Sequence, residues 1–513
     1  MDRLDTALAL YDDASALREA GRHEAAIAAF DALLDRFGDR PPEGRADLVA
    51  DAMLHKGALL GEVGRREAAL PIYDAIVERF GPAPDRELRW TVALALLDKA
   101  HTLRELGRRE EAIAAYGDAF ERCAHDRSAR VRREAAAALM WQALVLEHLG
   151  RLEESLAAHG RMAGRFAGAS DPHVRRQVCR SMRSRGAVLQ RLDRHAEAMS
   201  AYDEVLERYG EIDDDEVHVD VAWALYGTGR ALEELRQADE ALAPYEQVVA
   251  RFGDLDDWSL RGPLGRARHA LAELLVAKAR SLVSRGRLDE GLAEFDELLV
   301  RFGTATDPRV RRALDGALAD KAQALVVAGR RDEAKVVADA LGARVEDGAQ
   351  EGGRVLSAMA ALGRATALLM DEPEEAIALY DELLAEIGDA ADPELRRCAV
   401  TALNNKIGCL ELLGRTQEGQ EVFAEMAARF GPEAVAMLDE NARVFGGMLT
   451  AEAREPLAGV LYRKAQVLAA MDDRSGALAA YDDVLARFEH DESPVIAEIV
   501  SASREAHDRL GGA

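Results

Sequence analysis

The 513-residue sequence predicts an all-α fold, a right-handed α-solenoid superhelix of about eleven helix-turn-helix repeats. The first observation is an aromatic position that recurs every 43 residues through the first half of the chain. The second is a composition with only 5% aromatics, rich in alanine, leucine, arginine and glutamate, which suits helices packed through small residues. The third is that six of the seven lysines share one phase of the repeat, eight residues before a turn.

The second helix of each repeat is the clearer one. It follows a turn, carries a small residue and, four residues later, the aromatic; another aromatic comes seven residues further on, so both rings share one helix face. The recurring positions are Phe30, Tyr73, Tyr116, His159, Tyr202, Tyr245, Phe295, Ala338 (degenerate), Tyr380, Phe423 and Tyr481. A glycine such as Gly38 or Gly81 follows in most repeats, and we expect it to end the helix in the left-handed conformation.

The first helix of a repeat begins at an acid-proline pair in several units. The pairs are Asp171-Pro172, Asp307-Pro308 and Asp392-Pro393, with the acid as N-cap and the proline in the first turn. Near its end this helix carries a small residue and, three residues later, a leucine. Small residues let neighbouring helices approach, and the leucines fill the space between them.

The repeats predict one array over residues 1–490 and a C-terminal capping helix over residues 491–513, which opens with Ser493-Pro494. The array is irregular at 253–270, at the glycine-rich stretch 341–353, and at 431–452, where the sequence has fifteen extra residues. Two interpretations stay open for these stretches. They are surface loops without a special role, or the stretch at 341–353 is a hinge.

Two segments show the full repeat pattern of small residue, leucine, turn glycine, alanine and aromatic: KGALLGEVGRREAALPIY (56–73) and KAHTLRELGRREEAIAAY (99–116). This pattern resembles the tetratricopeptide repeat (TPR) family, in an extended 43-residue variant of a unit that is usually about 34 residues long. The resemblance covers nearly the whole chain. It implies stacked helical hairpins with a concave surface that holds an extended peptide or a helix.

Charge and composition bound the function. A net charge of -27 disfavours general nucleic-acid binding, which needs a basic face. The N-terminal sequence has no basic segment ahead of an apolar core, and no run of about 18 apolar residues occurs, so we expect a cytoplasmic protein that binds no membrane. The alanine- and arginine-rich composition resembles that of high-GC bacterial proteins.

No catalytic constellation is evident: there is no phosphate-binding glycine loop, no HExxH and no nucleophile elbow. The four cysteines show no CxxC spacing and no nearby histidine pair, so we expect reduced, packed thiols and no metal site. These cysteines are Cys123, Cys179, Cys398 and Cys409. The prediction is a protein that is not an enzyme and needs no cofactor.

Residues 161–194 are an arginine-rich exception in an acidic chain. The candidate partner-binding residues, an anionic-ligand patch, are Arg175, Arg176, Arg180, Arg183 and Arg191. One interpretation is a groove of guanidinium groups for an acidic partner. The other is that these arginines pair with the acidic run at 211–216 in the next repeat.

The lysine phase predicts a structural column of ion pairs. The residue that directly follows the aromatic of the second helix lies eighteen residues after the lysine position, and this residue is often acidic. The predicted pairs, each within one hairpin, are Lys56–Asp74, Arg185–Asp203, Lys278–Asp296, Lys321–Asp339 and Lys464–Asp482. A ligand-binding ladder would not need matched acids, whereas a lysine stem that reaches the facing helix would.

The sequence therefore predicts a non-catalytic scaffold or adaptor that binds a partner peptide or helix in its concave groove. The alternative is a regulatory sensor subunit whose superhelix changes shape when a peptide or small ligand binds, with the signal passed to a separate effector. The family's chaperone-type carboxylate clamp has its only counterpart in Asn404, Asn405 and Lys406, so no chaperone-tail binding is predicted.

Overall fold

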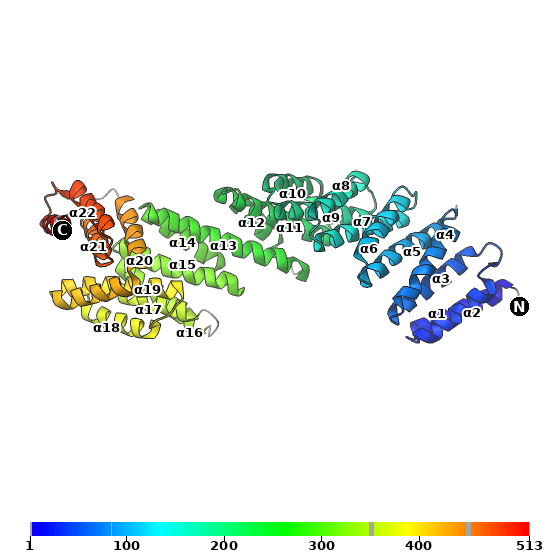
Figure 1. Cartoon of the computed structure of the whole chain (residues 1–513), viewed down its shortest axis with the longest axis horizontal. Helices are drawn as coiled ribbons and strands as arrows, with labels where there is room; N and C mark the ends of the chain where they lie inside the picture. Colours follow the sequence, from blue (N-terminus) through cyan, green and yellow to red (C-terminus); the bar gives the residue numbers. More distant parts are fainter. Residues whose placement is uncertain (1–2, 84, 256, 348–352, 448–452, 512–513) are drawn as a thin grey trace. The chain divides into compact units, whose positions relative to one another are not determined.

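The computed structural model describes residues 3–83, 85–255, 257–347, 353–447 and 453–511. Within these ranges the chain forms 23 α-helices and one short 3-10 helix, with no strand, so the all-α prediction is confirmed (Figure 1). Successive helices pair into eleven antiparallel hairpins, and α23 follows the last of them. The fold is an α-solenoid of helical repeats.

The chain divides into two compact units, residues 1–267 and 268–513, with the boundary inside α13. The helices of unit 1 are α1 (Arg3–Glu19), α2 (His23–Phe37), α3 (Ala46–Glu62), α4 (Arg66–Phe80), α5 (Arg86–Glu105), α6 (Arg109–Cys123), α7 (Ala129–His148), α8 (Leu152–Phe166), α9 (Pro172–Arg191), α10 (His195–Tyr209), α11 (Asp215–Glu234), α12 (Ala238–Phe252) and η1 (Trp258–Leu260).

Unit 2 begins within the helix that crosses the boundary. Its helices are α13 (Arg261–Ser284), α14 (Leu288–Phe302), α15 (Pro308–Val327), α16 (Arg331–Asp347), α17 (Gly353–Leu368), α18 (Pro373–Ile387), α19 (Pro393–Leu412), α20 (Thr416–Gly447), α21 (Arg454–Ala470), α22 (Arg474–Phe488) and α23 (Pro494–Gly511).

The aromatic of each second helix anchors its hairpin. Phe30 and Tyr116 are fully buried, and the first residues of α2, α4, α6, α8, α10 and α12 follow one another at intervals of 43. The aromatic ring lies against the small residue of the first helix: a Cβ at Gly57 would lie 2.7 Å from Tyr73 Cε1. Glycine at that position therefore makes room for the ring.

Most residues with positive φ lie in the turns inside the hairpins, and of the second helices only α18 ends, within the described residues, at a glycine with positive φ, Gly388 (φ 55°). Gly38 and Gly81 have φ of −51° and −54°, so the predicted left-handed caps are wrong at these positions. The Gly38 N–H donates to the Leu34 carbonyl 2.7 Å away, which continues the helical geometry. Positive φ occurs instead in the turn between the two helices, as at Gly64 and Gly107.

The acid-proline starts are confirmed. Asp171 accepts a hydrogen bond from the Val174 N–H, and Asp307 and Asp392 cap α15 and α19 in the same manner. The predicted C-terminal helix is also present as α23 up to residue 511. It packs on α21 and α22 through Ile496 and Val500, which are buried.

The irregular stretches differ from one another. The stretch 253–270, apart from residue 256, contains η1 and the start of α13. Within 341–353, the stretch of the expected hinge, α16 continues to residue 347 and α17 begins at Gly353. Residues 348–352 lie outside the described residues, and the hinge stays a prediction. In 431–452, the loop interpretation is wrong for residues 431–447, because they are helical; residues 448–452 lie outside the described part.

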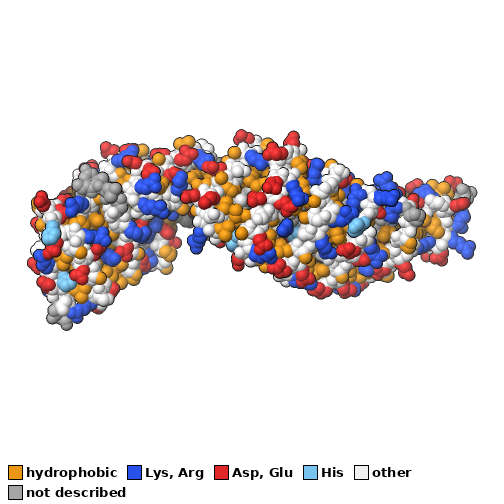
Figure 2. Space-filling view, turned by 90° about the horizontal axis from the view of Figure 1, so that it is seen from above, with side chains coloured by type: hydrophobic (Ala, Val, Ile, Leu, Met, Phe, Trp, Pro, Cys, Tyr) orange, Lys and Arg blue, Asp and Glu red, His pale blue; other side chains and the backbone are white. Residues whose placement is uncertain are grey.

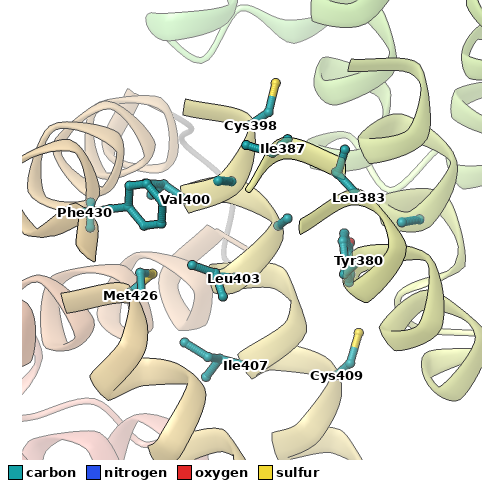
Figure 3. Packing of buried hydrophobic residues seen from close by; sticks show 14 of the residues in the cluster. Tyr380, Leu383, Ile387, Cys398, Val400, Leu403, Ile407, Cys409, Met426 and Phe430 are labelled. Atoms are coloured by element: carbon teal, nitrogen blue, oxygen red, sulfur yellow. The ribbon is translucent and has the colours of Figure 1, made fainter. Parts of the chain in front are cut away.

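The helical residues 431–447, which we call the α20 extension, follow a kink at Phe430 (φ −136°, ψ 24°). The ring of Phe430 belongs to a buried cluster between α18, α19 and α20 (Figure 3). In Figure 3, Leu403 of α19 lies between Met426 of α20 and Tyr380 of α18. This cluster packs α19, along its whole length, against both parts of α20.

All four cysteines are free and buried, which confirms packed thiols.

Basic and acidic side chains are interleaved over the face shown in Figure 2. Among the described helices, none is both long enough and apolar enough to cross a lipid bilayer.

Candidate functional site

The arginine-rich segment lies mainly on α9, and its side chains face acids of α11. Arg176 Nε lies 3.0 Å from Asp214 Oδ2, and its Nη1 lies 3.0 Å from Glu216 Oε1. Arg183 Nε lies 2.9 Å from Asp220 Oδ1, and Arg180 Nε lies 3.6 Å from the other oxygen of the same carboxyl. These contacts join two adjacent first helices of unit 1.

The Asp220 side chain is only 4% exposed, and burial raises its pKa although Arg183 and Arg180 oppose the rise. Arg191 contacts Glu147 at 3.4 Å, and Arg175 Nε is buried with no hydrogen-bond partner among the described residues. A buried carboxylate needs its arginines. The contacts therefore favour internal pairing, and binding of an acidic partner at 161–194 stays a prediction that requires these pairs to break.

The lysines also make ion pairs, but with a different partner from the predicted one. Lys99 Nζ lies 2.5 Å from Asp74 Oδ1, and Lys321 Nζ lies 2.5 Å from Asp296 Oδ1. In both cases the acid is 25 residues earlier, on the second helix of the preceding hairpin. Further pairs at this spacing are Lys56–Asp31, Lys406–Asp381, Lys464–Asp439 and, with histidine in the lysine position, His507–Asp482.

The pairings Lys56–Asp74, Lys321–Asp339 and Lys464–Asp482 are thus corrected. The physical reason is that a first helix packs between two second helices, and its lysine points to the earlier one. The column is structural, but it links each hairpin to the one before it.

Two bases of the column contact an acid of their own hairpin instead. For Arg185, the residue 25 positions earlier is Gly160, which offers no carboxylate, and the arginine contacts Glu204, at 3.6 Å, instead of the predicted Asp203. Lys278 contacts Glu294, at 2.5 Å, instead of the predicted Asp296. Burial raises the pKa of Asp203, which receives no contact from Arg185.

A cavity of about 660 Å³ in unit 2 is the strongest candidate for a binding site. Its walls come from the first helices α13, α15, α17 and α19, from Phe295 of α14, and from the α20 extension. The extension contributes one face of its helix, at positions 433, 436, 437, 440, 441, 444 and 445. Its size lies in the range of ligand sites, roughly 300–1,000 Å³.

The α13–α15 wall of the cavity carries an ion pair. Arg280 Nε lies 2.5 Å from Asp320 Oδ2, and the Asp320 side chain is 22% exposed. Burial raises the pKa of Asp320, and the Arg280 guanidinium opposes that rise. The Arg280 guanidinium therefore stabilises the ionised form of Asp320.

The other charged lining residues are also paired. Arg397 lies 2.8 Å from Glu394 within α19. Glu433 of the α20 extension lies 2.7 Å from Arg396 of α19, and this contact ties the extension to the first helices. The last pair is Glu440–Arg443. Each charge that faces the cavity has a countercharge beside it.

Amides, together with the hydroxyl groups of Ser284 and Thr401, supply the uncharged polar groups of the lining. Asn404 donates to Asn405 Oδ1 at 3.3 Å, and Asn405 donates to Thr366 Oγ1 at 3.2 Å. Lys406, the third member of the clamp-like triplet, pairs with Asp381 and does not line the cavity. Asn404 and Asn405 thus belong to the site, while the lysine does not.

Sequence reasoning missed this cavity because its lining comes from six helices spread over residues 280–445. The fifteen extra residues at 431–452 were the available signal. Asp439 was a second signal, because it lies 25 residues before Lys464, as Asp296 lies 25 residues before Lys321. This spacing places the α20 extension in the position of a second helix. The aromatic position of that unit is occupied by the fully buried Leu438, so no aromatic marked it.

Three stretches of the chain match models of the tetratricopeptide repeat: residues 11–84, 97–170 and 177–253. Solved structures similar to the chain include BtubC (BKLC) from P. vanneervenii, at 12% identity and a TM-score of 0.34, over 47% of this chain and 93% of that one. A tetratricopeptide repeat protein from Parabacteroides merdae has 15% identity and a TM-score of 0.28, over 61% and 99%.

The TPR2AB domain of yeast Sti1, in a structure described as a pHSP90 complex, has 15% identity and a TM-score of 0.24, over 61% of this chain and 98% of that one. No curated protein matches the sequence. The family matches agree with the hairpins, the aromatic positions and the turn residues described above. Residues 11–84, 97–170 and 177–253 of the chain therefore carry tetratricopeptide repeats.

Proposed function

We propose that this chain is a non-catalytic interaction scaffold and that the cavity of unit 2 holds a segment of a partner protein. The observation that supports the proposal is the cavity itself, formed where the α20 extension lies over the first helices of four successive hairpins. Stacked repeats bind partners on such continuous surfaces, because each repeat adds side chains to one face.

Partly exposed apolar side chains support the proposal further. Met359 and Leu362 of α17, with Met437 and Phe445 of the α20 extension, line the cavity and are only half-buried. Their remaining exposed surface would be covered by a bound segment, which releases water from apolar groups. The hairpin contacts and the Arg396–Glu433 ion pair between α19 and the extension hold these groups in place.

Site-specific photocrosslinking tests the proposal. A photoreactive phenylalanine analogue is placed at Ala436, which is exposed and faces the cavity, or at Ala385, which is exposed on α18 and does not line it. We expect a protein crosslink from position 436 and not from position 385. Equal crosslinking from both positions, or crosslinking from position 385 alone, would contradict the proposal.

A further inference from the structure

The charges of the cavity restrict what it can bind. Each of its charged side chains already has a countercharge, as in Arg280–Asp320 and Arg397–Glu394. An anionic ligand group that draws Arg280 away would leave the Asp320 carboxylate, only 22% exposed, without its partner, which is unfavourable. A cationic group at Asp320 would lie beside the Arg280 guanidinium, which repels it. This wall of the cavity therefore disfavours both an anionic and a cationic group.

Two lining amides have unused hydrogen-bonding capacity. Gln323 of α15 and Asn441 of the α20 extension make no hydrogen bond within the described residues. Each side-chain amide has a carbonyl oxygen that accepts and an NH₂ group that donates. The N–H and C=O groups of a peptide main chain offer the complementary donors and acceptors.

The apolar lining suits side chains of varied shape. Met359 and Met437 carry flexible, polarisable thioethers, which adapt to irregular partners. Leu362 and Phe445 add branched and aromatic surface. These groups favour aliphatic or aromatic side chains over polar ones, because the apolar surface of both partners is removed from water.

We infer that the cavity binds an uncharged, apolar peptide segment whose main chain is held by Gln323 and Asn441. The inference rests on the proposed function and names the chemistry of the partner segment. It differs from recognition of a charged tail, because the cavity's basic side chains are committed to its own acids.

Fluorescence anisotropy of the full chain with three dansyl-labelled, C-terminally amidated pentapeptide pools tests this inference. One pool contains only Leu, Ile, Val, Met and Phe; the second has Asp or Glu at its central position, and the third has Lys or Arg there. We expect the apolar pool to bind at least about tenfold more tightly than either charged pool, the equivalent of about 1.4 kcal/mol. Dansylamide alone is the small apolar molecule for comparison, and we expect it to bind weakly.

The test protein carries Gln323→Leu and Asn441→Leu, which remove both lining amides. The control protein carries Gln417→Leu and Gln420→Leu, which remove two exposed amides of α20 outside the cavity. The cavity double variant loses two neutral hydrogen bonds to the peptide, each worth about 0.5–1.5 kcal/mol, so it should bind the apolar pool roughly tenfold more weakly. The control double variant should bind the apolar pool as the unmodified chain does. Unchanged thermal melting shows that the variants remain folded.

The outcomes separate the inference from the proposed function. Tighter binding of a charged pool, no loss in the cavity pair, or equal binding of dansylamide would each overturn the inference. Ala436→Trp fills the cavity, with Ala385→Trp as its control. If Ala436→Trp abolishes binding of a charged pool, the proposed site stands and the apolar preference fails; if it leaves every pool unaffected, the proposed site fails as well.

Discussion

The ammonium group of Lys99 lies 2.5 Å from the carboxylate of Asp74, which belongs to the preceding hairpin. The same relationship, at a spacing of 25 residues, recurs at Lys321 and Asp296. A lysine stem crosses the packed surface between neighbouring repeats and places its charge at the edge, where water and the acid both reach it. The pairs therefore act on the register between hairpins.

A double-mutant cycle distinguishes this link from pairing within one hairpin. Lys321→Ala combined with Asp296→Ala should show a coupling of about 0.5 kcal/mol, because Lys321 is 13% exposed but Asp296 is 62% exposed and screened by water. Urea unfolding of the four proteins gives the coupling. The same cycle with Asp339→Ala is the control, and a larger coupling with Asp339 would contradict the assignment.

Two glycines of α3 should respond to alanine in opposite directions. A Cβ at Gly57 would lie 2.7 Å from the Tyr73 ring, so Gly57→Ala should destabilise the fold by about 1–3 kcal/mol through overpacking. A Cβ at Gly61 would meet nothing within 4 Å, so Gly61→Ala should stabilise it by up to about 1 kcal/mol. Urea midpoints measure both, and the same sign for both variants would contradict the packing described.

Asp98 should make stability depend on pH. Burial, with a contribution from Glu134, raises its pKa to about 6, above the usual value of about 4. Between these values the folded protein holds a proton that the unfolded chain releases, so this group's contribution to stability falls as the pH rises. Asp98→Asn should therefore raise the urea midpoint at pH 7, by an amount that shrinks toward pH 4. A difference that does not vary with pH would show that Asp98 does not titrate in this manner.

The buried thiols should react slowly in the folded protein. Burial raises the pKa of Cys123 to about 12, and those of Cys398 and Cys409 to about 11, so little thiolate is present at pH 8. Mass spectrometry after treatment with iodoacetamide should find modification in urea and little in buffer. Rapid modification of Cys398 in buffer would indicate that the wall of the cavity opens.

The repeat could be predicted from the sequence because one ring packs against one small residue in each hairpin, as Tyr73 does against Gly57. The partner of each lysine could not be predicted from the sequence, because a lysine such as Lys321 has an acid at both candidate positions, Asp296 before it and Asp339 after it. Only the packing order of the helices decides between them. The cavity escaped prediction because Leu438 replaces the marker aromatic in the α20 extension, so this helix resembled an insertion.

Hydrogen–deuterium exchange of the full chain with and without the apolar peptide pool tests the central claim most directly. We predict slower exchange in the described parts of α15, α17, α19 and the α20 extension, whose side chains line the cavity. The second helices α16 and α18, and the helices of unit 1, should exchange at unchanged rates. Protection confined to unit 1 or to those second helices would contradict the account.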